Sequence, residues 1–194
     1  MSNKQKAMVF IYPLLSRITK WIGKSQKIIK STSMAPESFY LLNAVLIHGE
    51  TFSFESLKGK KVLLVNTASD CGYTPQYKGL EQLHQQEKDR LVIIGFPSND
   101  FGEQEKGSNN EIGNFCEKNF GVTFLLTQKS IVKKMSGQDP VYKWLTDETK
   151  NGWNDVAPSW NFCKYLVNEE GNLTHFFESG IEPLSKKMAD AIHE

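Results

Sequence analysis

Residues 61–75 read KVLLVNTASDCGYTP, and this segment joins an apolar run to a helix start. Lys61–Asn66 is a continuous apolar run, which is typical of a central strand buried on both faces. Thr74-Pro75 predicts a helix with Thr74 as its N-cap and Pro75 at its first helical position. The inward face of this helix is expected to carry Tyr77, Leu80, Leu83 and His84.

The segments on either side continue the pattern. Leu91–Phe96 is a second buried strand that ends at Pro97, so the strand–helix–strand order predicts a right-handed parallel crossover. Hairpins are expected around Gly49 (residues 39–54) and Gly171 (Phe162–Val167 and Leu173–Phe177). Three more helices are expected to begin at Ser108, where Glu111 completes a capping box, at Asp139-Pro140 and at Glu182-Pro183.

Four or five strands with helices on both faces predict an α/β, thioredoxin-like fold with a central mixed sheet. The chain has 194 residues, 39% hydrophobic and 23% charged, which is ordinary for one soluble domain. Three cysteines are too few for a disulfide scaffold. The longest apolar run, Met8–Tyr12, is far shorter than the ~20 residues of a membrane-spanning helix.

Charge is distributed unevenly along the chain. Residues 1–36 contain seven basic residues and no acid, whereas residues 37–194 contain 16 basic and 22 acidic residues, a net charge of −6. Binding to nucleic-acid phosphates needs a basic face. The mildly acidic body therefore argues against nucleic acid as a partner.

The basic N-terminal segment has the periodicity of an extra amphipathic helix. Lysines and Arg17 fall opposite an apolar face. This helix could pack on the body, lie on an anionic membrane surface through residues 8–30, or act as a targeting segment. With a linker at Ser31–Pro36, the sequence predicts an extension over residues 1–36 and a domain over residues 37–194. The apolar face consists of Ile11, Leu14, Leu15, Ile18, Trp21, Ile22, Ile28 and Ile29.

Cys71 is the candidate reactive residue. It follows a buried strand and precedes a helix, so its sulfur is expected near the positive end of that helix. Lowering the pKa of such a thiol from ~8.5 to ~6 would make it ~90% ionised at neutral pH. A buried structural cysteine is the alternative. A Cys-x-x-Cys dithiol is absent, because Thr74 occupies the fourth position.

Three ordered motifs resemble the glutathione peroxidase family in its cysteine form. Residues 65–74 (VNTASDCGYT) resemble the peroxidatic motif, and residues 95–105 (GFPSNDFGEQE) and 160–167 (WNFCKYLV) resemble the second and third blocks. The resemblance covers about residues 38–190 and leaves residues 1–36 outside.

The resemblance implies a thioredoxin-like thiol peroxidase that reduces hydrogen peroxide and organic or lipid hydroperoxides. It implies that Cys71 is the peroxidatic residue, with Gln104, Trp160 and Asn161 as its partners. Amide and indole N–H groups are donors at every relevant pH, so they can stabilise first the thiolate and then the developing oxyanion. No metal or bound cofactor is expected, only an external thiol reductant.

The second block departs from the family pattern at Ser98, Asp100 and Lys106. The departure at Asp100 bears on the chemistry, because a carboxylate near the pocket would oppose a thiolate. We therefore expect Asp100 either to point away from Cys71 or to pair with a cation.

The sequence allows two interpretations of Cys116. Ile112, Phe115 and Cys116 share a helical face, which fits a core cysteine. The resemblance instead matches Cys116 to the resolving cysteine of the thioredoxin-dependent branch, which converts a sulfenic acid into a disulfide. A disulfide needs Cα atoms within ~7 Å. A cysteine held inside a formed helix is not expected to come this close to Cys71. The helix Ser108–Asn119 is therefore expected to unwind locally during turnover, and Gly113 should lower the cost of unwinding.

The remaining expectations concern partners and location. The resemblance implies that a protein with a resolving cysteine uses thioredoxin in preference to glutathione. It also implies a monomer, because the short segment 137–158 lacks the longer insertion of tetrameric relatives. Cys163 is expected to be a packed thiol, and the four histidines lack metal-ligand spacing. Three cysteines with one reactive thiol fit a cytoplasmic protein. The alternatives are a peroxide sensor that passes its disulfide to a partner, a non-enzymatic binding module, and a lipid-hydroperoxide enzyme held at a membrane by residues 8–30.

Overall fold

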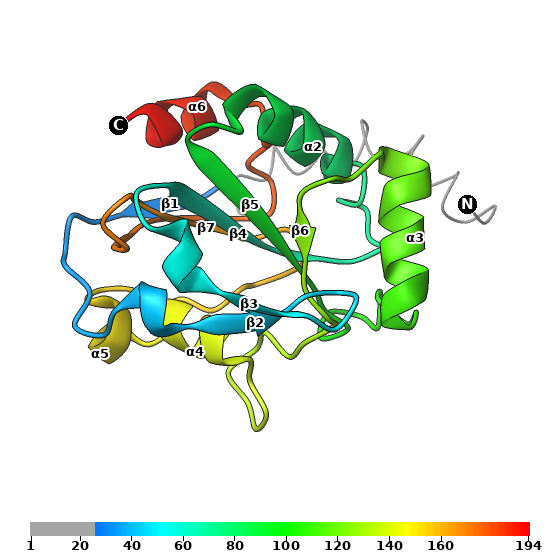
Figure 1. Ribbon diagram of the computed structural model, residues 1–194, viewed down its shortest axis with the longest axis horizontal. Helices are drawn as coiled ribbons and strands as arrows, with labels where there is room; N and C mark the ends of the chain where they lie inside the picture. The colour runs from blue at the N-terminus through cyan, green and yellow to red at the C-terminus, as the bar shows by residue number, and fades with distance from the viewer. Residues whose placement is uncertain (1–25) are drawn as a thin grey trace.

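The computed structural model describes residues 26–194, which form a six-stranded mixed sheet with a separate two-stranded hairpin (Figure 1). The strand order in the sheet is β1-β8-β7-β4-β5-β6. The strands are β1 (Ile28–Lys30), β2 (Asn43–Val45), β3 (Thr51–Ser53), β4 (Lys61–Thr67), β5 (Leu91–Pro97), β6 (Leu125–Leu126), β7 (Lys164–Val167) and β8 (Leu173–Phe177). The α-helices are α2 (Gln76–Glu87), α3 (Asn109–Phe120), α4 (Pro140–Leu145), α5 (Glu148–Asn151) and α6 (Lys186–His193), and 3-10 helices span Phe39–Leu41 and Phe54–Leu57.

The expected crossover β4-α2-β5 forms the centre of the sheet. Strands β4 and β5 pair in parallel, with Leu63 opposite Ile93. On its other side β4 pairs antiparallel with β7, with Val65 opposite Lys164. Every residue of β4 is buried because both of its faces are covered.

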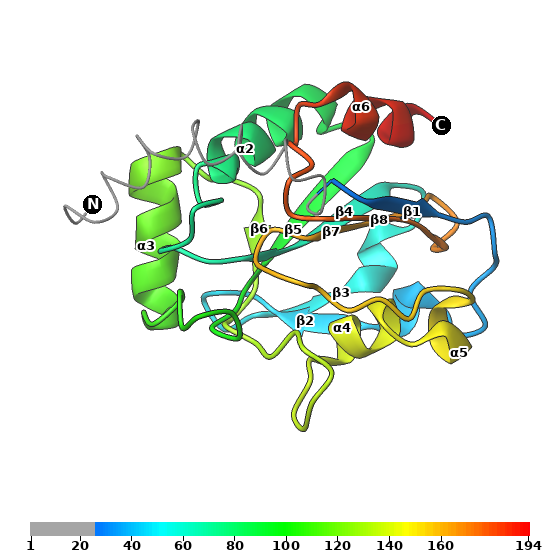
Figure 2. The same ribbon diagram turned by 180° about the vertical axis from the view of Figure 1, so that it is seen from behind.

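The two faces of the sheet carry two hydrophobic cores. Helices α2, α3 and α6 supply the first core, which contains Leu63, Val65 and Ile93 of the sheet. Helix α4, both 3-10 helices and the hairpin β2–β3 supply the second core, which contains Val62 and Leu64. Figures 1 and 2 show α2 and α6 on one side of the sheet and α4 and α5 on the other. The expected layers, with helices on both faces, are confirmed.

Two of the predicted helix starts are confirmed, and two differ from the prediction. The capping box of Ser108 and Glu111 begins α3, and Asp139 caps α4. Thr74, however, does not cap α2, which follows Pro75, because the Thr74 hydroxyl is engaged by the preceding loop. The last helix, α6, begins after Ser185, later than the expected start at Glu182-Pro183. Both expected hairpins form.

The helical prediction for the N-terminal segment was wrong at Ile28 and Ile29. These residues belong to β1, which pairs antiparallel with β8. Ile28 packs against the first core and Ile29 against the second, which is the alternation of a strand. The expected linker that follows is also anchored, since the Ala35 N–H donates to Asn172 Oδ1 at 2.9 Å. The rest of the predicted amphipathic helix lies in residues 1–25, outside the described residues.

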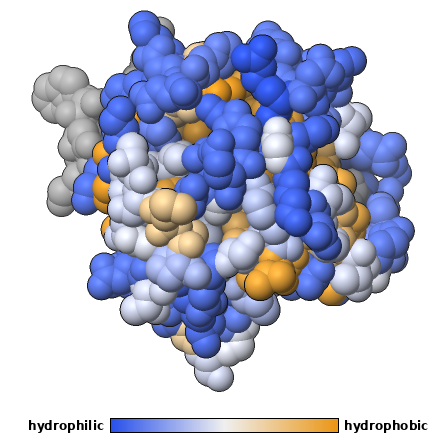
Figure 3. Space-filling model, turned by 60° about the vertical axis from the view of Figure 1, so that its left-hand side comes forward, coloured by the Kyte–Doolittle hydropathy of each residue, from blue (hydrophilic) through white to orange (hydrophobic). Residues whose placement is uncertain are grey.

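Most large hydrophobic side chains of residues 26–194 are buried in the two cores. Figure 3 shows a face that is mostly hydrophilic, with its hydrophobic atoms in small separate areas. Over residues 26–194, no helix has the length and apolar character needed to cross a membrane.

Because β1 belongs to the sheet, we predict different stabilities for two truncated chains. Removal of residues 1–31 deletes β1 and exposes the edge of β8, whereas removal of residues 1–25 leaves β1 in place. The chain that lacks residues 1–31 should have a Tm several degrees lower. A loss of ~1 kcal/mol in the free energy of unfolding lowers the Tm of a domain this size by about 2–4 °C. Equal thermal unfolding midpoints for the two chains would contradict the pairing of β1 with β8.

Candidate active site

The loops that carry the predicted site residues meet at one edge of the sheet. Strands β4 and β5 run in parallel, so the loops after them lie side by side. Strand β7 is antiparallel to β4, so the loop before β7 reaches the same edge. These loops carry Cys71, Gln104 and the pair Trp160 and Asn161.

Thr74 shapes the loop around Cys71. Its Oγ1 accepts a hydrogen bond from the Cys71 N–H at 3.0 Å and donates to the Ala68 carbonyl at 2.8 Å. The Tyr73 N–H donates to Cys71 Sγ at 3.4 Å. The sulfur therefore receives a backbone donor from the turn before α2, in line with the expected polar environment.

Burial dominates the electrostatics of Cys71, whose side chain is 1% exposed. Desolvation raises the pKa of its thiol, and the N–H of Tyr73 and the side chains of Asn161 and Trp160 lower it. The carboxylate of Asp70 raises the pKa further, and the net direction is upward. The expected lowering of the Cys71 pKa was therefore wrong, because removal of the sulfur from water outweighs its donors.

Gln104 joins the site through Asn161. Asn161 is fully buried and its Nδ2 donates to Gln104 Oε1 at 2.9 Å. The Gln104 carbonyl accepts from the Asp70 N–H at 3.0 Å, which ties its loop to the Cys71 loop. Trp160 is 39% exposed, at the mouth of the site, and its ring lies against Phe101. The structure thus brings together the predicted residues, with Gln104 in contact with Asn161.

Two residues beside these side chains adopt left-handed backbone conformations. Glu103 precedes Gln104 with φ 52°, and Phe162 follows Asn161 with φ 67°. Such conformations are unfavourable for residues other than glycine and concentrate at functional sites. Here they turn the backbone on either side of the two amide side chains.

Asn66 is a positioning residue that the sequence analysis did not identify. Its Nδ2 donates to the backbone carbonyl of Trp160 at 2.9 Å, and its backbone carbonyl accepts from the Phe162 N–H at 2.6 Å. Asn66 therefore fixes the backbone on both sides of Asn161. An amide side chain directly after the apolar run Val62–Val65 was the signal that could have identified it.

Asp100 points away from the reactive sulfur. Its Oδ2 accepts from the backbone N–H groups of Val132 and Lys133 at 2.7 and 3.0 Å. The first expected alternative for this carboxylate is therefore confirmed. Of the other two departures, Ser98 is buried and Lys106 pairs with Glu103 at the surface.

Cys116 and Cys163 are free and buried thiols. Cys116 lies on α3 in the same hydrophobic core as Cys71, and burial raises its pKa to about 12. Cys163 packs beside Ser179, with Sγ 3.4 Å from the serine hydroxyl. In the part of the chain that the structure describes, no cluster of His, Cys, Asp or Glu could hold a metal ion.

Substitution of Trp160 by Phe should raise the pKa of Cys71 further. The change removes an indole donor from the thiolate, which is worth about one pH unit. The pH dependence of Cys71 alkylation measures this shift, in a background where Cys116 and Cys163 are serine. Trp153→Phe is the matched control, because that indole donates to the Leu173 carbonyl instead. An unchanged profile in Trp160→Phe would remove Trp160 from the thiolate site.

Comparison with known proteins agrees with this geometry. The glutathione peroxidase family model matches residues 39–146. The glutathione peroxidase-like peroxiredoxin GPX5 of Chlamydomonas reinhardtii is 49% identical over 155 residues, which cover 78% of this chain and 93% of that protein. The glutathione peroxidase-like peroxiredoxin HYR1 of Saccharomyces cerevisiae is 45% identical over 157 residues, which cover 80% of this chain and 94% of that protein.

Solved structures agree on the fold. The apo crystal structure of Trgpx has a TM-score of 0.62 and 34% identity, covering 82% of this chain and 98% of that one. A thiol:disulfide interchange protein of the thioredoxin family from Chlorobium tepidum has a TM-score of 0.57 at 17% identity, covering 84% of this chain and 96% of that one. The latter supports the fold alone and confirms a thioredoxin-like architecture. The chain belongs to the glutathione peroxidase family and is an oxidoreductase of the peroxidase type.

Proposed function

We propose that this enzyme reduces hydrogen peroxide and organic hydroperoxides, lipid hydroperoxides included, at Cys71. The observation that carries the proposal is the set of donors around a buried sulfur: the Tyr73 N–H with the side chains of Asn161 and Trp160. In a site without water, such donors stabilise charge more strongly than they would in solution. They support both the thiolate and the oxyanion that forms as the peroxide bond breaks.

In the first half-reaction, Cys71 Sγ attacks one peroxide oxygen. The O–O bond breaks, and the other oxygen leaves as hydroxide or alkoxide and takes up a proton. Cys71 is oxidised to a sulfenic acid while the peroxide is reduced to water or an alcohol. This chemistry requires no metal.

In the second half-reaction, Cys116 attacks the sulfenic acid, and water leaves as the disulfide forms. An external dithiol, thioredoxin in preference to glutathione, then reduces the disulfide. The relatives named peroxiredoxins support a thiol-based cycle. The placement of Cys71 and Cys116 in one hydrophobic core supports their pairing.

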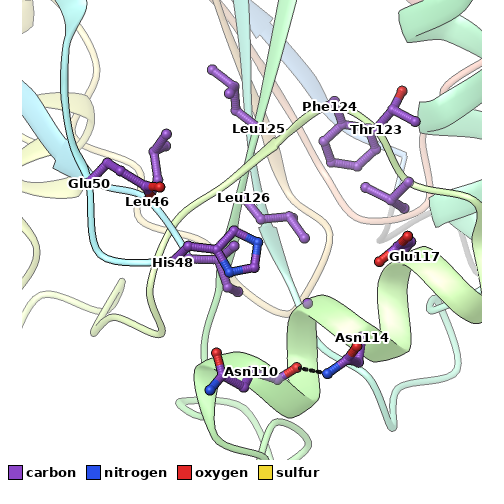
Figure 4. Close-up of a pocket in the computed structure, with 13 residues that line it drawn as sticks. Leu46, His48, Glu50, Asn110, Asn114, Glu117, Thr123, Phe124, Leu125 and Leu126 are labelled. Carbon is purple, nitrogen blue, oxygen red and sulfur yellow. Dashed lines mark hydrogen bonds between the residues drawn. The ribbon is translucent and has the colours of Figure 1, made fainter.

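Helix α3 has room on two sides for the local unwinding that this pairing requires. A hollow of about 340 Å³ lies between α3 and the β2–β3 hairpin, lined by Asn110, Asn114 and Glu117 of the helix (Figure 4). A second hollow of about 310 Å³ adjoins Ile112 and Phe115. Helices with few packed neighbours open at low free energy, so α3 is suited to release Cys116.

Steady-state peroxide turnover tests the function directly. Wild type, Cys71→Ser and Cys116→Ser are assayed with a thioredoxin system and, separately, with glutathione. We expect turnover with thioredoxin that both substitutions abolish, while Cys163→Ser, the matched control, stays active. If wild type consumes one equivalent of peroxide and then stops with both reductants, the protein is a peroxide sensor. If Cys116→Ser remains fully active, Cys116 is a core residue.

The Gly113→Ala substitution should slow disulfide formation without slowing peroxide reduction. A Cβ at Gly113 has ordinary contacts, the nearest with Ile47 at 3.7 Å, so the helix accepts it. Alanine stabilises a helix by about 1 kcal/mol relative to glycine, which corresponds to about fivefold slower unwinding. Gly79→Ala in α2 is the matched control. Equal rates of disulfide formation in Gly113→Ala and wild type would show that α3 does not unwind before the bond forms.

We also propose that the protein works as a cytoplasmic monomer. The three free cysteines, one of them the proposed reactive thiol, support a cytoplasmic location, and the short segment 137–158 supports a monomer. Contact with a membrane surface through residues 8–30 is a further proposal, and vesicle binding with and without these residues tests it.

A further inference from the structure

Glu105 is a buried acid that the chemistry described so far does not use. It follows Gln104 directly, and its side chain is 1% exposed. No other Asp or Glu among residues 26–194 is fully buried. Burying a carboxylate is unfavourable unless its surroundings compensate, so a fully buried acid beside a reactive site calls for an explanation.

Hydrogen bonds hold Glu105 against the Cys71 loop. Ser69 Oγ, two residues before Cys71, donates to Glu105 Oε2 at 3.0 Å. The Glu105 N–H donates to Asn99 Oδ1 at 2.9 Å. The nearby cation Lys129 hydrogen-bonds the Glu105 backbone carbonyl at 3.3 Å. The side-chain carboxyl group is therefore held in place by Ser69.

Glu105 also faces the helix that carries Cys116. The 310 Å³ hollow is lined by Ser69 and Glu105 on one side and by Ile112 and Phe115 of α3 on the other. These α3 residues lie one turn and one position before Cys116. The buried Tyr77 of α2 lies beside the Cys116 thiol, and it interacts electrostatically with both Cys116 and Glu105. The carboxyl group thus lies between the segments of the two cysteines.

We propose that Glu105 accepts the proton of Cys116 when this thiol resolves the Cys71 sulfenic acid. This inference rests on the proposed function. As the S–H proton moves to the carboxylate, Cys116 Sγ forms a bond to Cys71 Sγ and the S–O bond of the sulfenic acid breaks. The departing hydroxide takes the proton back from Glu105 and leaves as water. Cys116 is oxidised, Cys71 is reduced to the disulfide level, and Glu105 ends unchanged.

The charges around Glu105 fit a base that works near neutral pH. Burial raises its pKa to about 7, Asp70 raises it, and Ser69 and Lys129 lower it. Cys116, with a pKa of about 12, is almost wholly protonated at neutral pH and therefore needs a base. The other charged groups that line the hollow are Glu103, Lys106 and Glu111.

The test separates the two half-reactions in a single turnover. Wild type, Glu105→Gln, Glu105→Asp and Glu148→Gln, a control at an exposed position of α5, each receive one equivalent of hydrogen peroxide between pH 5.5 and 8.5. Peroxide loss reports attack by Cys71. Rapid acid quench, alkylation and mass spectrometry report the Cys71–Cys116 disulfide.

We expect the rate of disulfide formation in wild type to rise with pH through about 7, because the carboxylate is the base. Glu105→Gln should lose this rise and form the disulfide at least tenfold more slowly, since general bases contribute ~10²-fold or more. Its peroxide loss should change less than twofold. Glu105→Asp should recover part of the rate together with the pH dependence, and Glu148→Gln should behave as wild type.

The possible results distinguish failure of the Glu105 inference from failure of the proposed function. If Glu105→Gln forms the disulfide at the wild-type rate with the wild-type pH profile, the inference is overturned and the proposed function stands. Equal slowing of peroxide loss and disulfide formation also overturns it, because Glu105 then acts on the whole site. If Glu105→Gln does not fold, Glu105→Asp is the test variant. Disulfide formation by Glu105→Asp at the wild-type rate, with the wild-type pH dependence, then overturns the inference. If wild type forms no Cys71–Cys116 disulfide, the resolving step of the proposed function fails, whereas the peroxide loss still reports reduction of peroxide at Cys71.

Discussion

A sulfur that must become charged lies where water does not reach it, and the arrangement of this site follows from that constraint. Burial disfavours the Cys71 thiolate, and the Tyr73 N–H, Asn161 and Trp160 favour it. The same exclusion of water strengthens every donor around the sulfur. The site is therefore suited to stabilise charge as it develops during attack on a peroxide, when the donors act on both the sulfur and the leaving oxygen.

Donors act in this way only if they are held in place, and the loops of the site are fastened by backbone contacts. Thr74 closes the Cys71 turn, the Asp70 N–H binds the Gln104 carbonyl, and Asn66 holds the residues around Asn161. Asn66 belongs to β4, the strand that both cores cover, and the Cys71 loop follows that strand. The hydrophobic sheet thereby positions the polar site at its edge. Helix α3 is flanked by hollows, which suits the local unwinding that we propose for the second half-reaction.

The sequence predicted what depends on local pattern and on order along the chain. Apolar runs marked β4 and β5, capping residues marked α3 and α4, and the ordered motifs pointed to Cys71, Gln104, Trp160 and Asn161. It failed where distant contacts decide. Ile28 and Ile29 fit a helical period but pair with β8, because the edge of the sheet offered hydrogen bonds. The pKa of Cys71 depends on burial, and the roles of Asn66 and Glu105 depend on partners far along the chain.

The proposed function requires that peroxide oxidises Cys71 to a sulfenic acid and leaves the buried Cys163 thiol intact. The most direct measurement treats Cys116→Ser with one equivalent of hydrogen peroxide, traps sulfenic acid with a dimedone probe and maps the label by mass spectrometry. We expect a label on Cys71 and none on Cys163. A label on Cys163, or peroxide consumption with no label on Cys71, would contradict it.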